Sequence, residues 1–449
     1  MNWAKPGWAF CWDPPMHGLE LIDPDHYEMA KEDFLQQEEF QEILERARNL
    51  RDSGKEFSDV IDQEGCQYID LVQEGGGMLG IALVGYTYVL EEAGIRFFGL
   101  AGTSAGAINT LLLAGVGKMN GRKSEQILDV LSSQNLFDLV DGDPKIKDIL
   151  QAFIDETPFK KLRGRILWNI RRIKKSVFED LGINPGDEFV RWIEQVLSSS
   201  EPPVHTLAEL KDLRAKSHYP KGLRTRNGKP IEDPGAPMHI ITSDITTRSK
   251  VRFPELAPLY WGERADQVSP ALMVRASISI PVFFKPFEIP DVPGHGEPAT
   301  GDWLHKLDYR GKIPQTAKFV DGGLLSNFPI NVFHGSVSGD IRKPTFGVKL
   351  SEYRNKHSLN KNILSLIGSL VNAMRHDGDI EFLQDHPDYR YLICFMDADT
   401  RFNWLNFNMP LEKQMELFLH GARHAIHFLE KFSWTEYKQL RKSLGALKE

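Results

Sequence analysis

Short apolar runs alternate with longer amphipathic or apolar segments along most of the chain. Each short run ends at a glycine or a polar residue, which is typical of strands buried in a sheet. Strands are predicted at residues 68–72, 95–102, 238–243, 318–321, 346–350 and 391–396. The longer segments predict helices at residues 28–51, 81–90, 105–112, 363–374 and 411–432. With 449 residues, the chain can hold one large α/β domain with insertions, or two domains.

A serine turn follows the strand predicted at 95–102. Its sequence is Gly102-Thr103-Ser104-Ala105-Gly106, with an apolar helix directly behind it. A sharp change from strand to helix strains the backbone of the central residue, and small neighbours leave room where helix and strand cross. A Gly-x-Ser-x-Gly sequence alone is a weak signal, because most matches are ordinary turns. The predicted strand and helix on either side favour Ser104 as a nucleophile at a helix N-terminus, where backbone N–H groups stabilise a developing negative charge.

A glycine-rich segment at residues 75–80 joins the first predicted strand to an apolar helix. It has the Gly-x-Gly-x-x-Gly spacing of dinucleotide-binding loops, which require an acidic residue at the end of the next strand. That strand runs into Ser104 instead, so nucleotide binding is the weaker interpretation. The alternative is a nest of backbone N–H groups for an oxyanion. The candidate residues for this oxyanion hole are Gly75, Gly76, Gly77, Met78 and Gly80.

A third motif closes the strand predicted at 318–321, where Asp321 precedes Gly322 and Gly323. Asp-Gly turns are common structural features. A carboxylate at the end of a sheet strand is also where α/β proteins gather ligand-binding groups. The motif therefore makes Asp321 a candidate partner for Ser104.

Two assignments of the general base remain open from the residues alone. A serine in such a turn usually uses a histidine that a carboxylate holds in place. A triad is compatible with several histidines that follow Asp321 in the chain, among them His334, His357, His376 and His386. None of them lies in a recognisable catalytic turn. The alternative is that Asp321 itself takes the proton from Ser104, a role that suits a buried carboxylate.

The glycine-rich segment, the serine turn and the Asp-Gly-Gly turn occur in this order, and together they resemble the patatin-like phospholipase family. The resemblance extends from about residue 68 to residue 432, and the segment 276–286 is similar to a family segment that lines the active site. It implies an α/β fold with a three-layer α/β/α sandwich around a mostly parallel sheet. It also implies a serine acyl hydrolase of lipids that works with a Ser-Asp dyad and without a metal or other cofactor.

The resemblance assigns roles to individual residues. Ser104 would be the nucleophile, Asp321 the general base and later the acid, and the N–H groups of Gly76, Gly77 and Met78 the oxyanion hole. Members of the family commonly have arginine or lysine at the position of Leu79, so no charge is expected there.

The resemblance also suggests a division of the chain. Residues 1–65 would be an accessory N-terminal arm, residues 66–432 the catalytic domain with 117–235 as a cap insertion, and 433–449 a C-terminal tail. The cap carries a basic and apolar stretch that is either a solvated helix packed by one side or a surface that meets anionic lipid. The candidate membrane-facing residues are Lys160, Lys161, Arg163, Arg165, Trp168, Arg171, Arg172, Lys174 and Lys175.

Composition narrows the remaining choices. A net charge of −8 argues against general nucleic-acid binding. The three cysteines, Cys11, Cys66 and Cys394, have no disulfide-like or zinc-like spacing. There is no apolar run of about 18 residues and no secretory signal pattern, so we expect a soluble, cytoplasmic protein that associates peripherally with membranes.

The expected partners are a phospholipid or another acyl-ester lipid at a membrane surface, with room for a protein or small-ligand activator. Two alternatives remain open at this stage. One is a Ser-His-Asp esterase or thioesterase that acts on soluble acyl groups. The other is a non-catalytic scaffold of the same fold that binds lipid or a protein partner.

Overall fold

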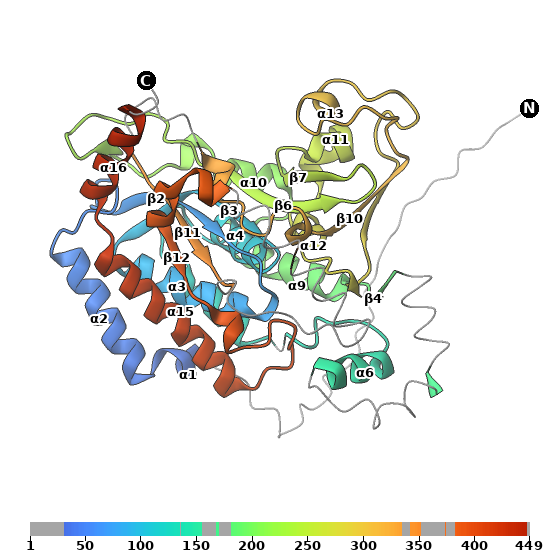
Figure 1. Cartoon of the computed structure of the whole chain (residues 1–449), viewed down its shortest axis with the longest axis horizontal. Helices are drawn as coiled ribbons and strands as arrows, with labels where there is room; N and C mark the ends of the chain where they lie inside the picture. The colour runs from blue at the N-terminus through green and yellow to red at the C-terminus, as the bar shows by residue number, and fades with distance from the viewer. Residues whose placement is uncertain are drawn as a thin grey trace, which may run out of the picture.

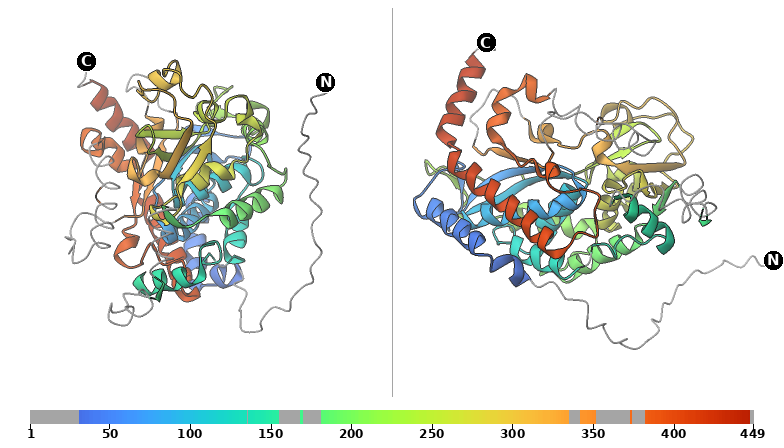
Figure 2. Two further views of the ribbon diagram at one scale, coloured as in Figure 1. Left: turned by 90° about the vertical axis from the view of Figure 1, so that its right-hand side faces the viewer. Right: turned by 60° about the horizontal axis from the view of Figure 1, so that its bottom comes forward.

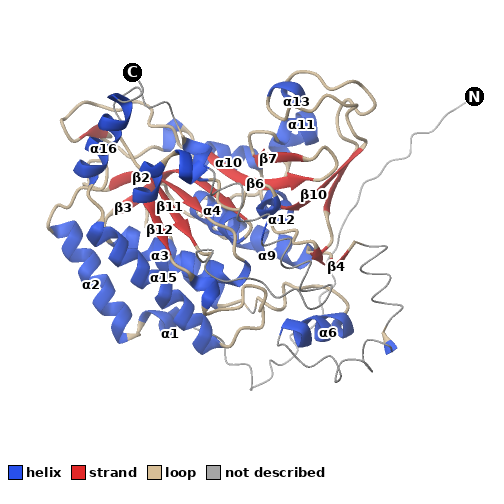
Figure 3. Ribbon diagram, viewed as in Figure 1, coloured by secondary structure: helices blue, strands red, loops and turns tan. Residues whose placement is uncertain are grey.

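The computed structural model describes residues 31–134, 136–154, 168–169, 181–334, 342–351, 373 and 382–446. Among these residues, ten strands form one sheet, with the main order β12-β11-β2-β3-β6-β10-β9. Figure 1 labels the elements, and Figure 3 shows the strands gathered in the centre with helices around them. The strands of this sheet are β1 (Val60–Ile61), β2 (Gln67–Gln73), β3 (Ile95–Thr103), β5 (Arg224–Thr225), β6 (Met238–Asp244), β7 (Ser249–Phe253), β9 (Phe287–Pro290), β10 (Thr316–Asp321), β11 (Thr345–Lys349) and β12 (Ile393–Phe395). A separate pair consists of β4 (Gly182–Asn184) and β8 (Val282–Phe284).

The sheet is mostly parallel. Strands β12, β11, β2, β3 and β6 all pair in parallel, whereas β7 and β10 run antiparallel to β6. The parallel register pairs Gln73 with both Val348 and Gly102. The segments that follow β2, β3 and β11 therefore emerge side by side at one edge of the sheet.

The α-helices with described bounds lie around this sheet. They are α1 (Lys31–Leu35), α2 (Glu38–Asp52), α3 (Gly80–Glu92), α4 (Ala105–Gly115), α5 (Ser124–Ser132), α6 (Pro144–Ile154), α9 (Asp187–Ser198), α10 (Leu207–Leu213), α11 (Ala257–Trp261), α12 (Ala271–Ser277), α13 (Asp302–His305), α15 (Leu411–Lys431) and α16 (Trp434–Ala446). Helices α2, α3 and α15 pack together, and Figure 2 shows α2 and α15 side by side from below. A Cβ at Gly421 of α15 would lie 1.9 Å from the carbonyl oxygen of Ala82. Glycine is therefore required where α15 crosses α3.

Both faces of the sheet are covered. Phe346 of β11 packs against Phe428 of α15, with ring centroids 5.0 Å apart. A Cβ on the next residue, Gly347, would lie 2.8 Å from Ile330 in the 3-10 helix η6 (Ile330–Phe333). Since successive strand residues point to opposite faces, helical segments lie on both sides. All residues of β2 and β3 are buried, and the predicted three-layer α/β fold around a mostly parallel sheet is confirmed.

Two predicted elements have different limits in the structure. The helix expected at 28–51 is interrupted, because Gln37 is extended and its side-chain amide donates to the Phe34 carbonyl oxygen at 3.0 Å, which separates α1 from α2. The strand expected at 391–396 is only Ile393–Phe395, because the preceding residues form the 3-10 helix η7 (Pro387–Leu392), which begins at a proline. Of the helix expected at 363–374, only residue 373 lies within the described residues.

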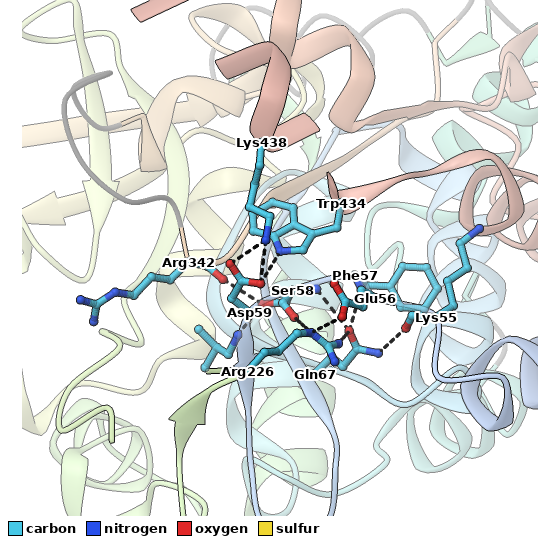
Figure 4. Close-up of polar contacts among 11 residues, drawn as sticks. Lys55, Glu56, Phe57, Ser58, Asp59, Gln67, Arg226, Arg342, Trp434 and Lys438 are labelled. Atoms are coloured by element: carbon cyan, nitrogen blue, oxygen red, sulfur yellow. Dashed lines mark hydrogen bonds and ion pairs between the residues drawn. The ribbon is translucent and has the colours of Figure 1, made fainter. Parts of the chain in front are cut away.

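The linker between α2 and β1 is fastened to distant parts of the chain (Figure 4). The carboxylate of Asp59 accepts hydrogen bonds from the Trp434 indole N–H at 2.8 Å and the Lys438 ammonium at 3.0 Å. Gln67 Oε1 accepts from the N–H of Phe57 and from the guanidinium of Arg226, both at 2.6 Å. The linker thus joins β2, the β5 hairpin and α16. The domain boundaries drawn at residues 65 and 432 stay predictions.

None of the described helices is both long and apolar enough to cross a membrane.

Candidate active site

Ser104 lies between β3 and α4 with φ +52° and ψ −118°, a conformation that non-glycine residues rarely adopt. The two glycines on either side of it leave no space for a side chain. A Cβ at Gly102 would lie 2.2 Å from the carbonyl oxygen of Gly106, and one at Gly106 would lie 2.4 Å from that of Gln73. The strained serine is therefore held by the direct contact of helix and strand backbones on both sides of it.

The hydroxyl of Ser104 donates a hydrogen bond to Asp321 Oδ2 at 2.6 Å. The other carboxylate oxygen of Asp321 accepts the N–H of Gly323 at 2.7 Å, which fixes the orientation of the carboxylate. Ser104 is 4% exposed and Asp321 is 7% exposed. The two residues thus form a short, buried contact between a hydroxyl and a carboxylate.

Asp321 is the last residue of β10, in agreement with the strand end predicted for it. This strand runs antiparallel to β6 and pairs Asp321 with Thr242. On the other side of β6, Thr103 pairs with Ile241. Ser104 and Asp321 therefore approach each other across β6 from strands of opposite direction.

The end of α12 holds the backbones of both residues. Ser277 Oγ accepts the N–H of Ser104 at 2.9 Å and donates to the Ile241 carbonyl oxygen at 2.6 Å. The carbonyl oxygen of Ser279 accepts the N–H of Asp321 at 2.9 Å. The buried guanidinium of Arg275 donates to Ser279 Oγ at 2.6 Å, and burial lowers the pKa of Arg275 to about 10. The sequence singled out this segment without indicating these bonds.

The histidines proposed for a triad have other partners where they are described. His334 Nδ1 lies 2.8 Å from the Tyr389 hydroxyl, and the His386 ring packs against His334. Among the described residues, no histidine hydrogen-bonds Ser104. His357 and His376 lie outside the described residues.

The glycine-rich loop offers fewer free donors than the sequence suggested. The N–H of Gly75 donates to the Asn327 carbonyl oxygen at 3.1 Å, and the N–H of Met78 donates to that of Trp404 at 3.0 Å. The N–H of Gly80 is used within the turn that begins α3. These three N–H groups already have acceptors. The oxyanion hole predicted from the sequence therefore included three donors that are not available in this structure.

Two N–H groups of the loop, those of Gly76 and Gly77, have no hydrogen-bond acceptor in the described part of the chain. Gly77 has φ +53°, and a Cβ there would lie 2.3 Å from the carbonyl oxygen of Trp404. The N–H of Ala105, at the start of α4, also has no acceptor among the described residues. From the sequence, Ala105 was expected only as part of the turn, although the residue after such a serine commonly contributes to an oxyanion hole.

A cavity with about 790 Å³ of empty space, partly open to solvent, lies beside Ser104. Gly77 and Ala105 line it together with Ser104. Six of its apolar residues come from the predicted cap insertion, namely Leu131, Leu136, Leu139, Val140, Phe189 and Trp192. Asn109 is a polar lining residue, and its amide group donates to Gln73 Oε1 at 2.6 Å. The mostly apolar lining suits an apolar chain.

The basic stretch of the cap lies outside the described residues, except for Trp168. The side chain of Trp168 is 88% exposed, and Leu181, on the other side of the stretch, is 46% exposed. Nothing further is described of Lys160, Lys161, Arg163, Arg165, Arg171, Arg172, Lys174 and Lys175.

Comparison with known proteins gives one family and several relatives. The model of the family described as patatin-like phospholipase matches residues 71–334. The uncharacterized protein YqhO of Bacillus subtilis (strain 168) is 30% identical over 371 residues, which cover 82% of this chain and 99% of that protein.

Two solved structures show a weaker similarity. VipD from Legionella pneumophila is 16% identical, with 84% of this chain and 70% of that chain covered and a TM-score of 0.36. ExoU in its complex with SpcU, from the type III secretion system of Pseudomonas aeruginosa, is 16% identical, with 81% and 51% covered and a TM-score of 0.31. The family model covers more than half of the sequence, and the chain therefore belongs to the patatin-like phospholipase family.

Proposed function

We propose that this protein hydrolyses carboxylic esters of membrane lipids, as a phospholipase A or lysophospholipase, through an acyl-enzyme on Ser104. Membership of a phospholipase family supports lipid ester hydrolysis in general. The observation that carries the specific proposal is the 2.6 Å hydrogen bond from Ser104 Oγ to Asp321 Oδ2 beside an apolar cavity.

In the first half of the reaction, Asp321 accepts the hydroxyl proton of Ser104 while the serine oxygen attacks the ester carbonyl carbon. The carbonyl oxygen becomes an oxyanion, for which Gly76, Gly77 and Ala105 supply N–H groups that have no acceptor among the described residues. When the bond to the alcohol breaks, the protonated Asp321 returns its proton to the departing oxygen. The products of this half are the acyl-enzyme and a lysolipid or another alcohol.

In the second half, water attacks the acyl carbon and Asp321 accepts a proton from that water. A second oxyanion forms at the same donors and collapses as Ser104 leaves. The proton on Asp321 then returns to the serine oxygen, and the fatty acid is released. This sequence uses two side chains and invokes no metal or cofactor.

The environment of Asp321 supports its role as the base. Gly323 N–H occupies Oδ1, so Oδ2 is the oxygen that faces Ser104. An alkoxide leaving group needs less protonation than an amine, which makes an ester a better substrate than an amide for this pair. The acyl chain would lie in the cavity between α4 and the cap residues Phe189 and Trp192.

The membrane-facing role of the cap remains part of the proposal. A basic stretch next to the exposed Trp168 combines apolar insertion with attraction to anionic lipid. Neutralising Arg171, Arg172, Lys174 and Lys175 is expected to reduce binding to phosphatidylglycerol vesicles at low salt. Unchanged vesicle binding would contradict this role.

The proposed function is tested by fatty-acid release from mixed phosphatidylcholine and phosphatidylglycerol vesicles. Wild type is expected to release fatty acid and to react with a fluorophosphonate probe. Ser104→Ala is expected to do neither while keeping its circular dichroism spectrum. Release by Ser104→Ala at the rate of wild type would exclude Ser104 as the nucleophile.

A further inference from the structure

The residue that precedes the glycine-rich loop, Glu74, carries a carboxylate with no exposed surface. Its Oε2 accepts the N–H groups of Leu350 at 2.6 Å and Ser351 at 2.8 Å. Its Oε1 accepts the Ser351 hydroxyl at 2.7 Å and forms a buried ion pair with the Lys349 ammonium at 2.5 Å. All of these partners lie at the carboxyl end of β11, so the carboxylate fastens the start of the loop to the neighbouring strand.

Asn327 ties the same point to the segment that follows the Asp321 turn. Its side-chain amide donates to Glu74 Oε1 and to the Gly75 carbonyl oxygen, both at 3.2 Å. Its own carbonyl oxygen accepts the N–H of Gly75 at 3.1 Å. The first glycine of the loop is therefore bonded on both sides by one residue, immediately before the two free donors Gly76 and Gly77.

The backbone of the loop is closely packed on both sides. A Cβ at Gly75 would lie 3.1 Å from the Cβ of Ser104, and one at Gly76 would lie 2.7 Å from a methyl group of Leu350. The backbone of the loop thus packs directly between the nucleophile and the end of β11. A displacement of Glu74 would move the donors relative to Ser104.

A buried ion pair contributes little to the free energy of folding by itself. Removing both charges from water costs several kcal/mol, and apolar side chains of similar volume are often equally stable. Burial by itself would raise the pKa of Glu74, but the Lys349 charge and the hydrogen bonds from Lys349 and Ser351 outweigh it and hold that pKa below its usual value. Glu74 is therefore negatively charged at neutral pH, and its carboxylate joins the start of the loop to the end of β11.

We infer that Glu74 and Lys349, together with Asn327, are positioning residues that hold the N–H groups of Gly76 and Gly77 where the substrate oxyanion develops. The inference rests on the proposed hydrolase function and adds to it the part of the fold that sets the oxyanion hole. None of the three residues needs to touch the substrate. Their effect is carried by the backbone of the loop.

The chain offers a matched control for this pair. Lys343 and Asp70 form a lysine–carboxylate contact at 2.6 Å, and it also joins β2 to the segment of β11. Lys343 precedes β11 and Asp70 is the central residue of β2, whereas Lys349 ends β11 and Glu74 follows β2. Lys343→Met therefore removes the same kind of charge from the same pair of strands without touching the loop.

The test compares an oxoester with the matching thionoester, in which sulfur replaces the carbonyl oxygen. Sulfur is a weak hydrogen-bond acceptor, so only the oxoester gains from correctly placed oxyanion donors. In Lys349→Met, the kcat for the oxoester is expected to fall about 100-fold, with KM and the thionoester rate changed only about twofold. In Lys343→Met, the ratio of the two rates is expected to equal that of wild type.

Two further variants distinguish an effect on the loop from a general folding defect of Lys349→Met. Glu74→Gln/Lys349→Met removes both charges and leaves none buried alone, and Asn327→Ala loosens Gly75 while the ion pair stays intact. Both are expected to lower the oxoester-to-thionoester ratio at least about tenfold. An equal fall of both rates, or an unchanged ratio, with wild type active, would overturn the inference alone. No Ser104-dependent hydrolysis of either ester by wild type would instead overturn the proposed function and the inference with it.

Discussion

The hydroxyl of Ser277 accepts a hydrogen bond from the N–H of Ser104 at 2.9 Å and donates one to the carbonyl oxygen of Ile241 at 2.6 Å. Ser277 thus connects the backbone of the strained serine to β6, across which Asp321 lies. This bond holds a residue at φ +52° that would otherwise relax toward common backbone angles. The geometry of the dyad therefore depends on α12 as well as on the turn itself.

Ser277→Ala is expected to lower kcat about tenfold and to leave KM within about twofold. The loss corresponds to about one buried hydrogen bond, which leaves the Ser104 N–H without an acceptor. The control is Ser249→Ala, which removes a buried hydroxyl of β7 that donates to the Thr247 carbonyl oxygen. Steady-state kinetics on one soluble ester measure both variants. Equal kcat values for them would show that Ser277 has no special role.

Narrowing the cavity is expected to change chain-length preference. Ile108 lines the cavity one turn after Ser104, so Ile108→Phe fills space next to the acyl-binding wall. The kcat/KM for a palmitoyl ester is expected to fall at least about tenfold relative to that for a butyryl ester. Ile245→Phe, at a position that is 47% exposed, should leave the ratio unchanged. A parallel loss on both esters in Ile108→Phe would argue against an acyl chain in this cavity.

Gly102→Ala is expected to destabilise the fold by about 3 kcal/mol. The added Cβ would lie 2.2 Å from a backbone oxygen of α4, so helix and strand must separate. Gly54→Ala is the control, since Gly54 has φ +73° but nothing within 4 Å of an added Cβ. It should cost only about 1 kcal/mol. Urea denaturation of both variants measures the difference, and equal losses would refute the close-approach argument.

Acid is expected to destabilise the protein through a buried histidine of α15. Burial lowers the pKa of His420 from 6.5 to about 4, and its imidazole lies 2.7 Å from the Met396 carbonyl oxygen. As the pH falls from 6.5 to 4, the unfolded chain binds a proton at this position and the folded chain does not. The free energy of unfolding therefore decreases across this window.

His239 contributes in the same direction, because burial also lowers its pKa to about 4. His420→Gln is expected to reduce the slope of unfolding free energy against pH between 4 and 6.5 without abolishing it. Chemical denaturation at several pH values gives this slope. A steeper slope in the variant would contradict the assignment of this pH dependence to His420.

The sequence predicted the parts of the site that depend on local patterning. Apolar runs and small residues were enough to place β2, β3 and the turn at Ser104, because a strand–turn–helix unit is specified by neighbours in the chain. The family resemblance added the three-layer fold and the pairing of Ser104 with Asp321. Only the strands and the turn could be predicted from local sequence, because Ser104 and Asp321 are 217 residues apart and their pairing came from the resemblance.

The rest depends on contacts between distant segments. The occupied N–H of Met78 could not be foreseen, because its acceptor is the carbonyl oxygen of Trp404. The antiparallel direction of β10 follows from pairing with β6, which a short apolar run does not encode. Glu74 and Lys349 are 275 residues apart. In the sequence, each is only a charged residue near the end of a strand, so their ion pair could not be predicted.

The central claim is that Asp321, without a histidine, serves as the base for Ser104. The most direct measurement is fatty-acid release by wild type, Asp321→Asn, His334→Ala and His386→Ala, with folding checked by circular dichroism. Asp321→Asn keeps the shape of the side chain and removes its ability to accept the proton, so release should fall at least about 10³-fold. Both histidine variants should stay within about threefold of wild type. Activity retained by a folded Asp321→Asn, or lost in either folded histidine variant, would contradict the dyad.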